Sequence, residues 1–254
     1  MKVMSFNIWN YTRPWPLRRK LIADLIRSHQ PDVISLQETR HDFRFESGLG
    51  QGDQLAELTD YTPTFMLGQV YFPILRVDEG VTTLTREAPR KVMRLDLSML
   101  PHEREDQNQR VCLGVRVMGD QGEVDIYNTH WSLSARARER NAVEVTRFIV
   151  QESQDRPTLV MGDFNAKPDT LPIRYLVGDA SIDGASGDFV DCWLAANPGQ
   201  PGFTYASFDP VRRIDYMMGR NLPRGVRNAK VIGSEPVEGV YPSDHMGILV
   251  ELDL

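Results

Sequence analysis

The sequence has little cysteine and no long apolar run, and both absences narrow the class of protein. Only two of the 254 residues are cysteines, and Cys112 and Cys192 each lie in an apolar stretch, VCLGV and DCWLA. Two distant thiols in such surroundings favour buried side chains over a disulfide or a cysteine-based metal site. No run approaches the roughly 18 apolar residues that a membrane-spanning helix needs, so we expect no membrane span.

Net positive charge and an apolar leader are lacking as well. The opening MKVMSFNIWN turns polar at Ser5 and Asn7, where a signal peptide would continue with apolar residues, and we therefore expect a cytoplasmic protein. The formal net charge of -6 disfavours binding to nucleic acid or anionic membranes through the overall field. A local basic cleft stays compatible with this charge.

Strand-like and helix-like segments follow each other irregularly. Apolar or alternating runs predict strands at 3–8, 32–38, 81–86, 110–117, 124–130, 158–163, 213–219 and 246–252. Apolar residues at helical spacing predict helices at 18–28 and 135–151 and a short one at 54–58. This order fits mixed β-sheets covered by helices better than a regularly alternating doubly wound sheet. The loops at 42–53, 101–109, 178–188 and 197–210 do not resemble linkers, so we expect a single α/β domain over residues 1–254.

The stretch TLVMGDFNAKPD, residues 158–169, combines a short buried strand with polar residues at its end. Gly162 allows a sharp turn, and Asp163 and Asn165 follow it two positions apart. Extended side chains alternate with period two, so these two can project to the same side. For this stretch alone, an Asx-turn is the simpler explanation.

Similar polar residues stand at the ends of other predicted strands. Asn7, Gln37, Glu38, Asn128, His130, Asp215, Asp244 and His245 all occupy such positions. Each has a structural explanation by itself, such as a cap, an ion pair of Asp215 with Arg213, or a half-buried histidine. Together they indicate a functional rim, because catalytic groups concentrate where strand ends and loops meet on a rigid scaffold.

The chemistry of these groups points to a phosphoester. Four of the acids are Glu38, Asp163, Asp215 and Asp244, and carboxylate oxygens are ligands for Mg²⁺, with Mn²⁺ or Ca²⁺ as alternatives. A hard cation offsets charge on phosphoryl oxygens, and amides and imidazoles stabilise the charge that develops during hydrolysis.

In chain order, the motifs SFNIW, LQE, EGVTTLTR, NTHW, GDFNAKPD, RIDY and SDH resemble the endonuclease/exonuclease/phosphatase superfamily from Ser5 to His245. The resemblance implies a four-layer α/β sandwich, in which two mixed β-sheets lie face to face with helices on the outside. It also implies a divalent-metal-dependent hydrolase of phosphoester bonds, either a phosphodiesterase or nuclease-like.

The same resemblance assigns roles to residues of this chain. Glu38 would be the main metal ligand, with Asn7 beside it and Asp244 contributing. Asn7 would also approach the phosphate. Whether one or two metal ions act stays open.

For catalysis, the resemblance implies that Asp163 and Asn165 orient the attacking water and hold a phosphate oxygen. His245, polarised by Asp215, would act as base or charge stabiliser, and His130 would donate to the phosphate or the leaving group. Whether Asp163 or the His245–Asp215 pair activates the water stays open.

The substrate is less defined. Trp9 and His130 stand where apurinic endonucleases carry Asp and Tyr, which disfavours abasic-site repair. Arg110 is a candidate phosphate ligand, and further candidate contacts are Arg13, Arg18, Arg19, Arg136, Arg138, Arg212 and Arg213. The expected partner is a phosphate-ester substrate, with nucleic acid among the candidates, and the oligomeric state stays open. One alternative is a phosphatase or phospholipase C-type enzyme acting on a small phosphorylated metabolite or lipid headgroup, and another is a non-catalytic binding protein.

Overall fold

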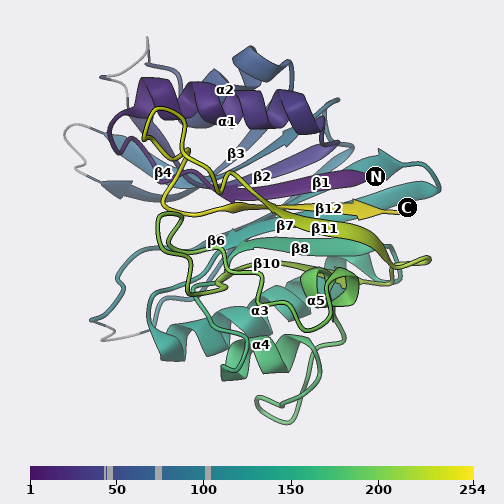
Figure 1. The fold of residues 1–254 in the computed structure, drawn as a ribbon. Coiled ribbons are helices and arrows are strands. Elements are labelled where there is room, and N and C mark those ends of the chain that lie inside the picture. Colours follow the sequence, from purple (N-terminus) through teal and green to yellow (C-terminus); the bar gives the residue numbers. More distant parts are fainter. Residues whose placement is uncertain (43, 45–47, 72–75, 101–103) are drawn as a thin grey trace.

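Two six-stranded mixed sheets lie face to face (Figure 1). The structure, a computed structural model, describes residues 1–42, 44, 48–71, 76–100 and 104–254. In spatial order, the first sheet consists of β11 (Val226–Ile232), β12 (Gly247–Leu252), β1 (Lys2–Asn7), β2 (Val33–Asp42), β4 (Val77–Thr85) and β3 (Thr62–Tyr71). The second consists of β5 (Lys91–Asp96), β6 (Val111–Gly119), β7 (Gly122–His130), β8 (Thr158–Asp163), β10 (Asp215–Arg220) and β9 (Val190–Asp191).

Helices cover both outer faces. Figure 1 shows α1 (Trp15–His29) and α2 (Gln51–Thr59) over the first sheet, and α3 (Ala135–Ser153) and α4 (Leu171–Leu176) over the second. The short α5 (Cys192–Ala196) contacts β10 and β11. These layers confirm the predicted four-layer α/β sandwich. No helix in the described part of the chain is both long and apolar enough to cross a membrane.

The space between the sheets is apolar at one end and polar toward the other. Val33, Ile126 and Met161 belong to the buried cluster that joins the sheets. Nearer the functional rim, Gln37 Nε2 of β2 donates to Asn128 Oδ1 of β7 at 2.8 Å. Since both side chains are fully buried, this hydrogen bond fixes the first sheet against the second next to the site.

Four strands of the described structure were not predicted, and all four lie at sheet edges. They are β3, β5, β9 and β11. An edge strand is partly exposed and often carries charged residues, so its apolar pattern is weak, as in KVMRLD and VRNAKVI. The helix predicted at 54–58 begins earlier, at Gln51. Residues 43, 45–47 and 101–103 of the predicted loops 42–53 and 101–109 lie outside the described residues.

Candidate active site

Three catalytic candidates stand side by side on neighbouring strands of the second sheet. His130 of β7 is in register with Asp163 of β8, and Asp163 is in register with Asp215 of β10. Asn7 ends β1 in the first sheet, while the chain termini lie together at the other end of the sandwich (Figure 1). The fold therefore brings the predicted strand ends to one rim.

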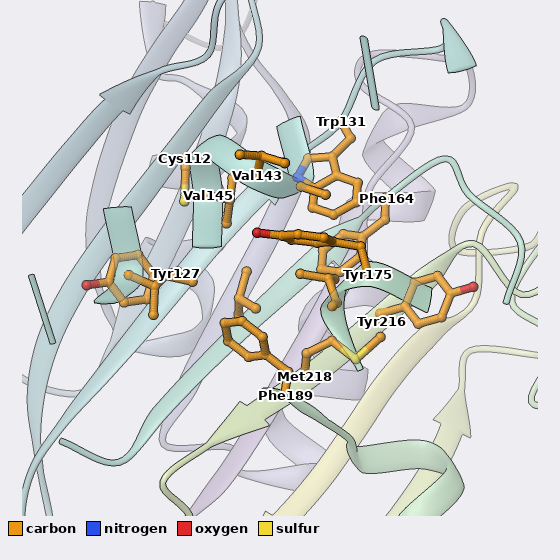
Figure 2. Close-up of a cluster of buried hydrophobic side chains, with 14 of the residues drawn as sticks. Cys112, Tyr127, Trp131, Val143, Val145, Phe164, Tyr175, Phe189, Tyr216 and Met218 are labelled. Atoms are coloured by element: carbon orange, nitrogen blue, oxygen red, sulfur yellow. The ribbon is translucent and has the colours of Figure 1, made fainter. Parts of the chain in front are cut away.

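Three aromatic residues that directly follow this row in the sequence form a stack, and Figure 2 labels all three within a cluster of buried hydrophobic side chains. The Phe164 ring centroid is 4.2 Å from that of Trp131 and 5.3 Å from that of Tyr216, with all three rings nearly parallel. Each ring follows a catalytic candidate in the sequence, and neighbouring residues of extended chain point to opposite sides. The rings thus anchor the row in the core. Trp131 is fully buried, which excludes it from stacking on a substrate base.

The turn after β8 is an Asx-turn, and its residues Asp163 and Asn165 also belong to the candidate site. Asp163 Oδ1 accepts from the backbone N–H of Asn165 at 2.9 Å, and Asn165 has a φ of 49°. Gly162 has a φ of 147°, and a Cβ there would lie 1.8 Å from the carbonyl oxygen of Thr129. Only glycine fits this close approach of β8 to β7. The glycine therefore sets the position of Asp163.

Asp163 is the centre of the cluster. Its Oδ2 accepts from Asn7 Nδ2 at 3.1 Å and lies 3.5 Å from His130 Nε2 and 3.7 Å from His245 Nε2. Asn165 Nδ2 lies 3.1 Å from His130 Nε2. A group bound between the two imidazoles would therefore meet a carboxylate and an amide as well.

The first sheet contributes Glu38 and two amides. Asn7 Nδ2 donates to Glu38 Oε1 at 3.1 Å, and Asn10 Nδ2 donates to Glu38 Oε2 at 2.9 Å. Glu38 has a φ of 54° where the register between β2 and β4 shifts, so a bulge turns its side chain toward the rim. Sequence reasoning missed Asn10, whose only signal was its place three residues after Asn7.

Arg18 holds the loop that carries Asn10. Its guanidinium is buried and donates to five backbone carbonyls, those of Ile8, Trp9, Asn10, Thr12 and Pro242. This corrects the expectation that Arg18 contacts phosphate, because its donors are occupied inside the protein. Burial lowers the pKa of Arg18 to about 10, against the opposing charges of Asp244 and Glu38, so it stays protonated at neutral pH.

His245 forms an ion pair with Asp215. Its Nδ1 lies 2.9 Å from Asp215 Oδ2. Burial by itself would lower the pKa of His245, but the charges of Asp215 and Asp163 outweigh it and raise the pKa to about 10. Burial and the charge of Asp215 raise the pKa of Asp163 to about 7. The imidazolium of His245 therefore lies next to the carboxyl group of Asp163, which titrates near neutrality.

His130 and Asp244 have shifted pKa values too. Burial, and then the charges of Arg110 and His245, lower the pKa of His130 well below 6.5, so its imidazole is neutral. Burial, and then the charge of Glu38, raise the pKa of Asp244 against the opposing effect of His245. The two histidines of the site thus differ in charge.

A divalent cation fits this set of groups. Asp163, Asp215 and His245 offer ligand atoms within 4.8 Å of one another, and all three are buried. Glu38 and Asp244, two of the predicted ligands, are close enough for the charge of Glu38 to raise the pKa of Asp244. Carboxylate oxygens suit Mg²⁺ or Mn²⁺, and crowded carboxylates gain from a bound cation. The ligand set of Glu38, Asn7 and Asp244 stays a prediction.

The site opens into a cavity of about 330 Å³. Arg110 lines it and also pairs with Asp106 Oδ2 at 2.9 Å, and Arg40 lines it while pairing with Glu79. Arg212 lines it too, with its guanidinium over the ring of Tyr205.

Other arginines that sequence reasoning offered as phosphate contacts are engaged elsewhere. Arg213 is buried against Asp191, with Nη1 2.7 Å from Oδ2. Arg138 donates to the carbonyls of Ser132 and Leu133, and Arg19 donates to Gln54. Arg13 lines a neighbouring cavity, described below.

Comparison with known proteins identifies the family. The sequence profile of the Endonuclease/Exonuclease/phosphatase family matches residues 4–245. The chain therefore belongs to this family of hydrolases that act on phosphoester bonds.

Individual relatives are distant. Nocturnin of Drosophila melanogaster is 24% identical over 277 residues, which covers 94% of this chain and 42% of nocturnin. Exodeoxyribonuclease III of Haemophilus influenzae is 28% identical over 192 residues, which covers 70% of this chain and 62% of the relative. The chain thus spans about half the length of these two relatives. The structure of a mannosyl-6-phosphatase from Bacteroides thetaiotaomicron matches with a TM-score of 0.78 at 20% identity and covers 100% of both chains.

Proposed function

We propose that the protein is a Mg²⁺-dependent phosphodiesterase or phosphatase whose reaction takes place at Asp163. The observation that carries the proposal is that the amide of Asn7 and the imidazoles of His130 and His245 surround Asp163 Oδ2. The amide of Asn165 contacts one of these imidazoles, that of His130. Asn7 of this group also touches Glu38, so the water-orienting groups and the proposed metal ligands are adjacent.

In the proposed site, Glu38, Asn7 and Asp244 would hold the ion. When bound, Mg²⁺ neutralises charge on the phosphoryl oxygens. Asn10 fixes the orientation of Glu38 through its second carboxylate oxygen.

The remaining residues act on the water and the phosphate. Asp163, oriented by Asn165 and Asn7, accepts the proton of the attacking water. His245, held by Asp215, stabilises the charge that develops on the phosphate oxygens. Asn165 Nδ2 donates to Nε2 of the neutral His130 and keeps that ring beside Asp163.

The test is hydrolysis of bis(p-nitrophenyl) phosphate and p-nitrophenyl phosphate by the purified protein, with and without EDTA. We expect activity that EDTA abolishes and that Mg²⁺ or Mn²⁺ restores. Glu38→Ala and His245→Ala should each lower kcat/KM by roughly a hundredfold or more. The exposed Glu57 of α2 supplies the control, since Glu57→Ala removes an acid far from the rim. Activity that survives chelation, or near-normal rates for both site variants, would sink the proposal.

One observation favours a small phosphate ester over a long nucleic acid. Of the three arginines that line the cavity, Arg40 and Arg110 are each paired with an acid, and only Arg212 makes no ion pair in the described part of the chain. A protein that grips a polynucleotide needs several unpaired cations on the phosphate backbone. We therefore expect KM to rise only weakly with salt, and a steep salt dependence would favour the nuclease.

A further inference from the structure

We propose that Arg212 binds a second anionic group of the substrate, a phosphate other than the one that is hydrolysed. The inference rests on the proposed phosphoester hydrolysis and adds a substrate class to it: molecules with two phosphate groups.

A short hairpin fixes the backbone of Arg212. The N–H groups of Thr204 and Tyr205 donate to the Arg212 carbonyl at 2.8 and 3.0 Å, and the Arg212 N–H donates to the Tyr205 carbonyl at 3.0 Å. The hairpin is tied to the segment before β12, because the Ser207 N–H donates to the Asp244 carbonyl at 2.7 Å. Arg212 is thus held in a constant position relative to the catalytic residues.

The side chain is positioned by a stack that ends on a catalytic candidate. The guanidinium carbon of Arg212 lies 4.6 Å from the ring centroid of Tyr205, and that ring lies 4.8 Å from the ring of His245. A guanidinium that packs over an aromatic ring can still form hydrogen bonds through its N–H groups. Less rotamer entropy is then lost when an anion binds.

The charge of Arg212 is not neutralised within the cavity. Arg40 and Arg110, which share the cavity wall, pair with Glu79 and Asp106. Arg212 makes no ion pair with any acid in the described part of the chain, although it is exposed beside several carboxylates. An arginine that the protein leaves uncompensated at the mouth of its active site is available to an anionic ligand.

The geometry assigns Arg212 to a second group of the substrate. Asn165, His130 and His245 already surround Asp163, where the scissile phosphate is proposed to bind. Tyr205 pairs with Arg212 on one side and with His245 on the other, so Arg212 lies one position farther from the catalytic residues than Tyr205 does. Its planar fork matches two phosphate oxygens, so a phosphate elsewhere on the same molecule fits it. Such a group occurs on a sugar bisphosphate and on a nucleotide chain alike.

A second cavity offers the rival position. It has a volume of about 570 Å³, adjoins the first through Arg40 and Tyr71, and contains the exposed Arg13. Because either arginine could in principle attract the second phosphate, the experiment must separate them.

The experiment compares matched ligands on four proteins. Dissociation constants are measured by calorimetry for fructose 1,6-bisphosphate against fructose 6-phosphate, and for the dinucleotide pTpT against TpT, with Ca²⁺ present. The proteins are the wild type, Arg212→Gln, Arg13→Gln, and the control Arg136→Gln, which removes the same charge from the exposed start of α3.

We expect the wild type to bind one bisphosphorylated ligand at least about tenfold more tightly than its monophosphorylated partner, as a charge-assisted hydrogen bond predicts. Arg212→Gln should abolish this preference and leave binding of the monophosphorylated ligand within about twofold, while the other two variants keep it. A preference within the fructose phosphate pair would indicate a phosphorylated metabolite as substrate, and a preference within the dinucleotide pair would indicate an oligonucleotide.

Two results would overturn the inference: no preference in the wild type for either pair, or a preference lost in Arg13→Gln and kept in Arg212→Gln. In both cases metal-dependent hydrolysis of the nitrophenyl esters would be unaffected, so the proposed function would stand. If the wild-type protein fails to hydrolyse the nitrophenyl esters, the proposed phosphoester hydrolysis itself is refuted.

Discussion

Replacing Arg18 by lysine tests whether the buried guanidinium positions the proposed metal ligands. Arg18 donates to five backbone carbonyls, and a lysine ammonium has only three N–H groups. At least two carbonyls therefore lose their donor. A buried unsatisfied polar group costs about 1–3 kcal/mol, so we expect Arg18→Lys to lower the free energy of unfolding by roughly 2–6 kcal/mol.

The same change should weaken metal binding. The carbonyls of Trp9 and Asn10 are among those that Arg18 holds, and Asn10 in turn orients Glu38. Loss of an orienting partner typically weakens metal affinity by roughly 10- to 100-fold. We expect a decrease of this size in the Mn²⁺ affinity measured by calorimetry, at a temperature where urea titration shows the variant to be folded.

Arg116 provides the matched control. It is also buried, and its Nε lies 2.7 Å from Asp125 Oδ1. Asp125 is in register with Thr158, the first residue of β8, whereas the catalytic candidate Asp163 is the last residue of that strand. Arg116→Lys should therefore lower stability and leave Mn²⁺ affinity unchanged. If folded Arg18→Lys binds Mn²⁺ within about twofold of wild type, the positioning argument is wrong.

Two further predictions follow from the site. In Asp215→Asn, the pKa of His245, measured by NMR without metal, should fall from about 10 toward its ordinary value of 6.5, since the main source of its increase is gone. A raised histidine pKa stabilises the folded protein fully below about 6.5, and this contribution disappears as the pH rises through about 10; unfolding free energy should therefore fall less between pH 7 and 10 in the variant than in the wild type. An unchanged NMR titration would contradict the ion pair. Gly162→Ala should cost roughly 3 kcal/mol or more in thermal or urea unfolding, because its Cβ would meet the Thr129 carbonyl at 1.8 Å, whereas Gly239→Ala, with open space around it, should cost about 1 kcal/mol. Equal losses in the two variants would refute the steric explanation.

The sequence allowed prediction of the sandwich and of the residues at its rim because both depend on local pattern. Asp163, His130 and Asp215 interrupt or end apolar strands, and such strands end together when their sheets assemble. The residues that act through the backbone could not be recognised from a local sequence pattern. Asn10 and Arg18 depend on a loop conformation whose carbonyls converge only in three dimensions.

The arginines near the rim show even more clearly that a residue's role cannot be predicted from the sequence pattern alone. In the sequence, Arg18, Arg212 and Arg213 are equivalent cations near predicted rim segments. In the structure the first is enclosed by carbonyls, the third is buried against Asp191, and Arg212 remains at the cavity. Partner and burial decide what a charge does, and neither is encoded in local spacing.

The position of β12 has a consequence for protein synthesis. This strand lies between β1 and β11 in the first sheet, and Asp244 and His245 directly precede it. The strand pairs with β1 through residues 248–251, so β1 and β11 stay unjoined until the residues of β12 have left the ribosome. A nascent chain that ends before Asp244 contains Glu38 and Asp163 but lacks His245. The proposed hydrolysis should therefore be absent from a chain that stalls before this position.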